Sequence, residues 1–234
     1  MSFDAAAEEY ERARPPYADA AIAWIGERLP LWRVLDLAAG TGKLTRRLVA
    51  AGADVVAVEP GEGMRAVLMR AVPGVEALAG SAEAIPLPDS SVDVVTVGQA
   101  FHWFRTEEAL REMHRVLRPG GGFALLWNIW DETDPLLRAV HAITDPLRPR
   151  DVGRDTSWRE TYDQALFGPL DRRTFRQVRT MTTDAIVAWA ASTSALLQAD
   201  PEVRGRALAD VRALAGTGPH EVSIGTDVTV ADRL

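Results

Sequence analysis

Short apolar runs that alternate with amphipathic stretches of about ten residues dominate the first 130 residues of the chain. The apolar runs are residues 32–37, 54–59, 92–97 and 123–127, and the stretches with helical periodicity are 44–51, 63–71 and 107–117. Apolar runs of this length are typical of parallel strands that are buried on both faces. The alternation therefore predicts a doubly wound α/β fold around a mostly parallel sheet.

The remaining residues extend this plan at both ends. Residues 1–30 predict two short helices separated at Arg14-Pro15-Pro16, because the residue before a proline avoids the helical conformation. The C-terminal part predicts strands at 174–181 and 221–230 with helices at 183–197 and 201–215. Nothing here has the composition of a flexible linker. We therefore expect a single domain over 1–234, made of cap helices (1–30), a ligand-binding core (31–130), a substrate-side insertion of helix and loop (131–173) and C-terminal strands and helices (174–234).

Composition argues against several kinds of function. The 234 residues carry 26 Lys plus Arg and 33 Asp plus Glu, and a net charge of −7 disfavours a nucleic-acid or anionic-membrane partner. The chain has no cysteine, and His141 and His220 lack acidic or histidine neighbours at ligand spacing, so we expect no metal site. No apolar run reaches the roughly 18 residues of a membrane span, and no secretion signal is evident, so we expect a cytoplasmic protein. The sequence does not indicate an oligomeric state.

The turn after the first apolar run, residues 36–42, narrows the choice of ligand. Its glycines would let a ligand approach the backbone at a helix N-terminus. A phosphate-binding P-loop would need Ser or Thr after Gly42-Lys43, where Leu44 stands. A dinucleotide site would need a third glycine where Thr45 stands, so that option is disfavoured but stays open. A nucleoside without phosphates is the third option.

Two acids, Asp36 and Glu59, favour the nucleoside. They are 23 residues apart, the separation of two consecutive βα units, and each ends a strand at the edge where open sheets bind ligands. Glu59 could accept hydrogen bonds from both hydroxyls of a ribose. Asp36 would repel a pyrophosphate but suits an ammonium or sulfonium cation. Either acid alone would often be structural, but two acids flanking a glycine turn favour a ligand site.

Five ordered motifs complete the pattern: residues 34–42, 58–64, 80–86, 93–104 and 112–121. Together they resemble the class I S-adenosylmethionine-dependent methyltransferases, within them the methyltransferase type 11 branch, which includes enzymes similar to trans-aconitate methyltransferase. The resemblance is strong over residues 1–130 and elsewhere extends only to the order of elements. It implies a Rossmann-like seven-stranded sheet, S-adenosyl-L-methionine as cofactor, and transfer of a methyl group to a small-molecule acceptor, such as a carboxylate or a hydroxyl.

The resemblance also implies roles for individual residues. The turn from Ala38 to Gly42 would pack under the methionyl part of the cofactor, and Glu59 would hold the ribose. Ala82 would offer its N–H to the adenine ring edge, with Ser81 beside the exocyclic amine. The implied cofactor-binding residues are Asp36, Ala38, Ala39, Gly40, Thr41, Gly42, Glu59, Pro60, Met64, Ser81, Ala82, Glu83 and Gln99, with Tyr10 and Arg14 from a capping segment.

Some of these positions depart from the family pattern or have a second interpretation. Ala38 stands where a glycine is usual, which is tolerable if its dihedral angles are ordinary, and Ser81 stands where many relatives carry Asp. Arg14 would pair its planar guanidinium with the methionyl carboxylate, but it could equally be a surface arginine. Tyr10 could equally be a core aromatic residue.

His102 is the candidate catalytic residue, because it follows the strand 92–97 at the edge where the ligand is expected. Its imidazole could take a proton from a hydroxyl acceptor. A carboxylate acceptor would need no base, since methyl transfer depends mainly on alignment, so packing or substrate contact is the alternative role. Trp103 and Asn128 are the further candidate substrate-binding residues.

The segment 131–173 has a local excess of arginine that suggests an anionic acceptor. Its arginines are Arg138, Arg148, Arg150, Arg154, Arg159, Arg172 and Arg173. Acidic residues in the same stretch offer the alternative that these side chains form surface ion pairs.

Two other classes of function compete with the methyltransferase. An NAD(P)-dependent oxidoreductase is disfavoured by Thr45 and by the absence of a Tyr-x-x-x-Lys pair, since Lys43 is the only lysine. A non-catalytic protein that binds S-adenosylmethionine is excluded by no sequence feature.

Overall fold

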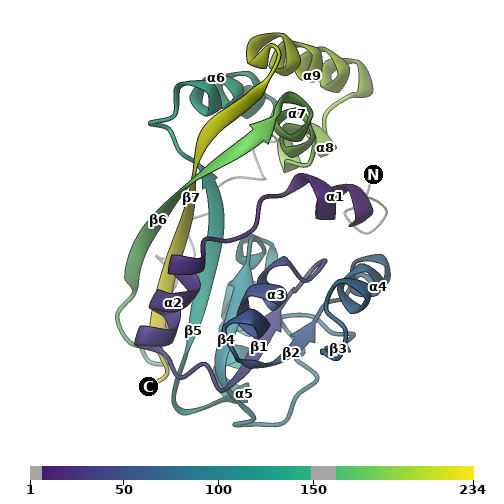
Figure 1. Cartoon of the computed structure of the whole chain (residues 1–234). Coiled ribbons are helices and arrows are strands. Elements are labelled where there is room, and N and C mark those ends of the chain that lie inside the picture. Colours follow the sequence, from purple (N-terminus) through teal and green to yellow (C-terminus); the bar gives the residue numbers. More distant parts are fainter. Residues whose placement is uncertain (1–6, 149–161) are drawn as a thin grey trace. The chain divides into compact units, whose positions relative to one another are not determined.

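The computed structural model describes residues 7–148 and 162–234 (Figure 1). Within them, one seven-stranded sheet has the strand order β3-β2-β1-β4-β5-β7-β6. The strands are β1 (Arg33–Leu37), β2 (Asp54–Val58), β3 (Glu76–Leu78), β4 (Val92–Gly98), β5 (Leu117–Trp130), β6 (Asp171–Thr182) and β7 (Pro219–Asp232). The strands β1 to β5 pair in parallel, which confirms the predicted doubly wound, mostly parallel sheet.

The described residues pack as two compact units. The larger consists of residues 16–127, 162–175 and 226–234, and the smaller of residues 7–15, 128–148 and 176–225. The predicted insertion at 131–173 therefore contributes to both units: 131–148 belongs to the smaller and 162–173 to the larger. The prediction of a single domain with cap, core and insertion stays a prediction.

In the larger unit, helices pack on both faces of the sheet. The helices are α2 (Asp19–Arg28), α3 (Lys43–Ala50), α4 (Glu62–Ala71) and α5 (Thr106–Val116), with the short 3₁₀ helix η1 (Phe101–Trp103). One apolar cluster joins α2 and α3 to alternate strand residues such as Val34 and Val94. A second cluster joins α5 and Phe167 to the intervening residues such as Leu35 and Val95. Both faces are therefore buried, as the unbroken apolar runs predicted.

The smaller unit combines α1 (Ala7–Ala13), α6 (Pro135–Thr144), η2 (Asp145–Leu147), α7 (Thr183–Ala191), α8 (Ser194–Leu197) and α9 (Pro201–Ala215) with the ends of three strands. Trp130 and Trp189 stack with ring centroids 3.7 Å apart in its apolar core. Asp131 ties its strands together, because it accepts hydrogen bonds from Arg176 of β6 and Ser223 of β7. Burial alone would raise the pKa of Asp131, but hydrogen bonds from Ser223 and Thr133, with the charge of Arg176, lower it to about 2.

Strand β7 runs against its neighbours. β5 and β6 pass along the chain from the larger unit into the smaller, whereas β7 starts in the smaller unit and ends in the larger. Since β7 lies between β5 and β6 in the sheet, it is antiparallel to both.

Three local features differ from the prediction. Strand β3 was not expected, because it has only three residues, of which Glu76 is exposed. Residues 118–122, which separate the predicted helix 107–117 from the predicted strand 123–127, belong to β5. The single helix expected at 183–197 is divided into α7 and α8, because the hydroxyls of Ser192 and Thr193 donate to the backbone carbonyls of Trp189 and Ala190.

Close packing of β4 against β5 leaves no room for a side chain at position 121. A Cβ atom added to Gly121 would collide with the carbonyl oxygen of Asp93, which is backbone and cannot rotate away. We expect Gly121→Ala to lower the free energy of unfolding by about 1–3 kcal/mol through overpacking. Gly205→Ala is the matched control, because space around Gly205 in α9 is open and alanine should gain about 0.5–1 kcal/mol there. Urea denaturation of both variants measures the difference; equal stabilities would contradict the assignment.

Candidate functional site

The candidate site lies in the larger unit, at the carboxyl edge of the parallel strands. Leu37, the last residue of β1, is level with Val58 of β2 and with Val97 of β4. The segments that follow these three strands therefore start from one edge of the sheet. This is the edge at which open α/β sheets bind ligands.

The turn between β1 and α3 has an unusual backbone. Ala38, Gly40 and Gly42 all have positive φ angles, of 54°, 57° and 83°. The Ala39 N–H donates to the Val58 carbonyl at 3.1 Å, which holds the turn against the end of β2. Ala38 therefore does not have the ordinary dihedral angles that would make alanine tolerable at this position. Its left-handed conformation costs an L-residue about 1–2 kcal/mol. Strain of this kind concentrates at functional sites.

Glu59 connects this turn to the next one. Its carboxylate accepts the Gly40 N–H at 2.9 Å and the Gly61 N–H at 2.8 Å, so one side chain joins the turns after β1 and β2. Its own backbone carbonyl accepts a hydrogen bond from Arg65 of α4. A carboxylate can accept several hydrogen bonds at once. Glu59 is thus held in place by the two turns that it joins.

Asp36 is the buried acid of the site. Thr45 of α3 donates to one of its carboxylate oxygens at 2.6 Å, and Thr96 of β4 donates to the other at 3.2 Å. Burial raises the pKa of Asp36 to about 7; the two hydroxyls oppose this rise and the charge of Glu59 adds to it. Thr45 therefore has a role of its own at the position where a dinucleotide site would need glycine.

The loop after β3 carries the residues expected at the adenine. Ser81 and Ala84 form an isolated β-bridge, and Ala82 between them is buried. Glu83 accepts the Arg105 N–H at 3.0 Å, just before α5. Burial alone would raise the pKa of Glu83, but hydrogen bonds from backbone N–H groups and from Ser81 lower it. Glu83 thus anchors the loop to the start of α5.

The end of β4 carries a second strained residue. Gln99 has a φ angle of 63°, and its N–H donates to the Leu126 carbonyl at 2.8 Å. A Cβ atom at Gly98 would collide with the Tyr17 hydroxyl, so the buried Tyr17 packs directly on this strand end. Left-handed non-glycine residues therefore follow both β1 (Ala38) and β4 (Gln99).

Two further predicted residues lie in the segment after β2. Met64 is a buried residue of α4, and the carbonyl of Pro60 accepts a hydrogen bond from Arg65.

The other predicted residues fall into two groups. His102 and Trp103 lie in η1 of the larger unit, with ring centroids 4.9 Å apart, and Trp103 is 48% exposed. Tyr10, Arg14 and Asn128 belong to the smaller unit. There Arg14 donates to the Ser192 carbonyl at 2.7 Å, and Asn128 donates to the Pro15 carbonyl at 2.9 Å. Tyr10 lies in α1.

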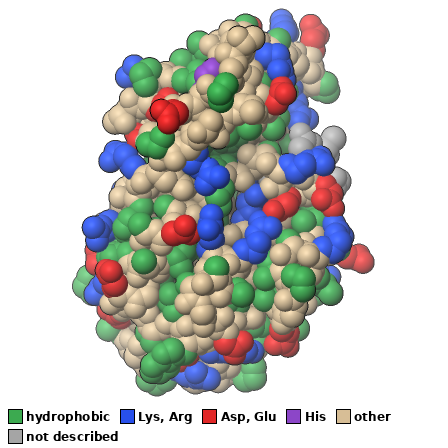
Figure 2. All heavy atoms as spheres, viewed as in Figure 1, with side chains coloured by type: hydrophobic (Ala, Val, Ile, Leu, Met, Phe, Trp, Pro, Cys, Tyr) green, Lys and Arg blue, Asp and Glu red, His purple; other side chains and the backbone are tan. Residues whose placement is uncertain are grey.

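The arginines of residues 131–173 are partly engaged by acids. Arg148 pairs with Asp145 at 3.2 Å, and Arg172 pairs with Asp227 at 2.8 Å. Arg150, Arg154 and Arg159 lie outside the described residues. On the face drawn in Figure 2, basic and acidic side chains are interspersed. The surface-pairing interpretation thus holds for Arg148, whereas Arg172 pairs with a buried acid outside this stretch.

The described residues, 7–148 and 162–234, contain neither a metal-binding cluster nor a helix suited to span a membrane. No cluster of three or more His, Cys, Asp or Glu there is arranged to hold a metal ion. In the same ranges, no helix combines the length and the apolar character that a membrane span requires.

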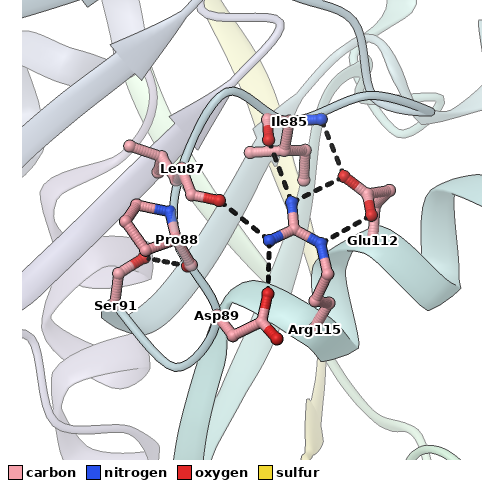
Figure 3. A network of polar contacts seen from close by, with 7 residues as sticks. All are labelled: Ile85, Leu87, Pro88, Asp89, Ser91, Glu112 and Arg115. Atoms are coloured by element: carbon pink, nitrogen blue, oxygen red, sulfur yellow. Dashed lines mark hydrogen bonds and ion pairs between the residues drawn. The ribbon is translucent and has the colours of Figure 1, made fainter.

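Sequence reasoning missed three side chains that organise the site. Thr96 was counted as part of an apolar run, although a hydroxyl inside a buried strand signals a nearby polar partner. Glu112 and Arg115 were seen only as part of a motif, although their i,i+3 spacing on a helix predicts contact. The structure shows that they hold the loop after β3 (Figure 3).

Comparison with known proteins agrees with this geometry. The family model described as a methyltransferase domain matches residues 35–125. An uncharacterized methyltransferase of Mycobacterium tuberculosis is 43% identical over 221 residues, which are 94% of this chain and 87% of that protein. A solved structure from Anaeromyxobacter dehalogenans, described as a type II methyltransferase, has a TM-score of 0.71 at 27% identity and covers 94% of this chain and 97% of its own.

A further structure shares the fold alone. The Haemonchus contortus phosphoethanolamine N-methyltransferase 2, solved with S-adenosylhomocysteine, has a TM-score of 0.58 at 15% identity and covers 98% of this chain and 57% of its own. The sequence relatives and the Anaeromyxobacter dehalogenans structure define the class of protein. The chain belongs to the class I S-adenosylmethionine-dependent methyltransferases. It is an enzyme of the branch that the methyltransferase domain model describes, and the oxidoreductase alternative is not favoured.

Because the pKa of Asp36 is raised, we expect the free energy of unfolding to decrease as the pH rises. The pKa is about 7 in the folded chain against an ordinary value of 3.8, so the folded state binds this proton more tightly. The resulting stabilisation is complete at low pH and is lost as the pH rises from about 4 to about 7. Asp36→Asn removes the titration, so the stability of the variant relative to wild type should rise across this window, by up to about 1.4 kcal/mol per pK unit.

Chemical denaturation at several pH values measures this difference. Asp210→Asn, at an exposed position of α9, is the control for the loss of one carboxylate. A constant difference between Asp36→Asn and wild type from pH 4 to pH 8 would contradict the assignment.

Proposed function

We propose that this enzyme holds S-adenosylmethionine at the carboxyl edge of β1, β2 and β4 and transfers its methyl group to an oxygen of a small molecule, either a carboxylate or a hydroxyl. The observation that carries the proposal is the carboxylate of Glu59, which is fixed between two turns by the N–H groups of Gly40 and Gly61. It offers an immobile acceptor for the two hydroxyls of a ribose. The net charge of −7 argues for a small-molecule acceptor rather than a nucleic acid.

The residues at this edge fit such a cofactor. A Cβ atom at Gly40 would meet nothing within 4 Å, so the turn is open on that side. The buried Thr41 hydroxyl has no hydrogen-bond partner among the described residues, and a buried polar group of this kind calls for one. Asp36 and Glu59 place two carboxyl groups at this edge, and the turn after β1 lacks the sequence of a phosphate-binding loop. Both features suit a cationic nucleoside.

Each part of the site has a proposed task. When bound, S-adenosylmethionine supplies a methyl group on a cationic sulfur, so the protein has mainly to align the acceptor. Glu59 holds the ribose, the turn 38–42 supports the methionyl part beside Asp36 and Gln99, and Ser81 and Ala82 contact the adenine. Pro60, Met64 and Glu83 support these residues from neighbouring segments. Tyr10 and Arg14 belong to the proposed cap, in which Arg14 pairs with the methionyl carboxylate.

His102, Trp103 and Asn128 are the proposed residues on the acceptor side. His102 is half-buried and follows β4, which carries Gln99 at its end. With a hydroxyl acceptor, the imidazole takes the proton as the oxygen attacks the methyl carbon. With a carboxylate acceptor, no proton has to be removed and His102 serves only in contact.

Removal of the Glu59 carboxylate should weaken binding of the cofactor product. We expect isothermal titration calorimetry to detect S-adenosylhomocysteine binding to the wild type and no saturable binding of NAD. Glu59→Ala should weaken the binding of S-adenosylhomocysteine by about 1.5–3 kcal/mol, because hydrogen bonds to a charged acceptor are lost. Glu62→Ala, an exposed acid in the first turn of α4, is the matched control and should bind normally. Saturable binding of NAD without binding of S-adenosylhomocysteine would refute the proposed function.

The role of His102 depends on the acceptor, and this dependence can be measured. With hydroxyl acceptors, His102→Asn should lower kcat by about 10²–10⁴-fold, the usual contribution of a general base. With carboxylic acids, the same variant should change kcat by no more than a few-fold. Methyl transfer from labelled cofactor to matched alcohols, carboxylic acids and amides gives both values. Equal losses for alcohols and acids would show that His102 is not the base.

A further inference from the structure

The loop between β3 and β4, residues 79–91, has few internal hydrogen bonds of its own. It contains the isolated bridge between Ser81 and Ala84, the Leu87 N–H bond to the Ile85 carbonyl, and two side-chain bonds, from Ser81 to Glu83 and from the Ser91 hydroxyl to the Pro88 carbonyl. A Cβ atom at Gly80 would lie 2.6 Å from Pro86, so the loop folds back closely on itself. Its shape must therefore be held largely from outside.

A single guanidinium contacts the loop at three points (Figure 3). Arg115 of α5 donates to the Leu87 carbonyl at 2.8 Å, the Ile85 carbonyl at 2.9 Å and the Asp89 carboxylate at 2.8 Å. Two further bonds, at 2.7 and 2.8 Å, go to the two carboxylate oxygens of Glu112. These five bonds match the five N–H donors of an arginine, so the whole donor capacity of Arg115 is directed at the loop and at one partner.

Glu112 also binds the backbone of Ile85. One of its carboxylate oxygens also accepts the Ile85 N–H at 2.9 Å, so both backbone polar groups of Ile85 are bound by the Glu112–Arg115 pair. Hydrogen bonds from Arg115 lower the pKa of Glu112, and those to Glu112 and Asp89 raise the pKa of Arg115. The pair thus stays charged across the working pH range, and a charged pair makes hydrogen bonds roughly twice as strong as neutral ones.

Helix α5 also holds the two ends of the loop. At its start, the Arg105 N–H binds Glu83. At its end, the carbonyls of Arg115 and Val116 accept the N–H groups of Ser90 and Ser91. The helix itself is fixed in the apolar core through Leu110 and Met113. The position of Ser81 and Ala82 is therefore set by α5, from which they are separated by more than twenty residues in the sequence.

We propose that Arg115 is a positioning residue that sets the base selectivity of the cofactor site, by fixing the loop through which Ser81 and Ala82 read the adenine edge. This inference rests on the proposed function, because it takes those two residues as the adenine contacts. Arg115 itself touches no reacting group. Its effect is on discrimination between bases.

The test compares S-adenosylhomocysteine with S-inosylhomocysteine, which differ only at the base edge. We expect wild type to bind the adenosyl compound more tightly. Arg115→Gln and Arg115→Lys should lose about tenfold in affinity for it, as expected from the loss of one or two neutral hydrogen bonds. Affinity for the inosyl compound should change less, so the ratio of the two dissociation constants should approach one. Arg115→Lys should not restore the selectivity for the adenosyl compound, because the ammonium of lysine lacks the planar set of N–H donors that a guanidinium has.

Arg111→Gln is the matched control. Arg111 lies one turn earlier on α5 and pairs with Glu107, so its removal changes the charge equally without touching the loop. Its ratio of dissociation constants should equal that of wild type. Hydrogen exchange gives an independent readout: the Ile85 amide should lose protection in the Arg115 variants, while β4 keeps its own.

The outcomes separate this inference from the proposed function. If wild type binds neither compound, the proposed function fails. If wild type binds both equally, or if Arg115 variants weaken both by the same factor, only the present inference is overturned. If the Arg115 variants do not fold, Asp89→Ala replaces them, since the Asp89 side chain is 78% exposed and makes one of the five bonds; an unchanged ratio in that variant overturns the inference.

Discussion

The hydrogen bonds from the Gly40 and Gly61 N–H groups to Glu59 are the interaction on which the candidate site depends. Parallel strands bring the segments that follow them to a common edge but do not connect those segments to each other. One carboxylate makes that connection here, because it can accept several donors at once. The strained backbone at Ala38 is tolerated within this arrangement. The residue that organises the two turns is also the proposed ribose contact, so one side chain would serve both structure and recognition.

The charge distribution at this edge follows from burial. Asp36 is fully buried, its carboxylate accepts hydrogen bonds from Thr45 and Thr96, and Glu59 adds negative charge nearby. A buried carboxyl with a raised pKa is poorly compensated by the protein alone. A cation that enters the site would relieve this imbalance, whereas a pyrophosphate would increase it. The electrostatics thus point to the same ligand class as the backbone geometry.

The sequence predicted the sheet and most helices because a buried parallel strand and an amphipathic helix are local patterns. Strand β3 was not predicted, because three residues that are exposed or half-buried are too few to show a periodic pattern. The break between α7 and α8 was not predicted either, because it depends on two hydroxyls that donate to backbone carbonyls. Asp36 and Glu59 could be placed at one edge, since strand spacing determines that position. The positive φ of Ala38 and the hydrogen bonds from Arg115 to the loop after β3 could not be predicted from the sequence. Both arise from contacts between segments that are distant in the sequence.

The interleaved composition of the two units has a consequence for how the chain is made. The smaller unit draws on residues 7–15, 128–148 and 176–225, and the larger unit needs residues 226–232 for a strand inside its sheet. During synthesis, the smaller unit cannot close until residues 176–225 have left the ribosome, and the larger unit cannot close until residues 226–232 have. Helix α1 must wait for α7, which is made more than 160 residues later, and the gap between β5 and β6 stays open until β7 inserts. Folding of this protein is therefore dominated by long loop closures, which are slow, and the two unpaired strand edges flanking that gap are exposed meanwhile.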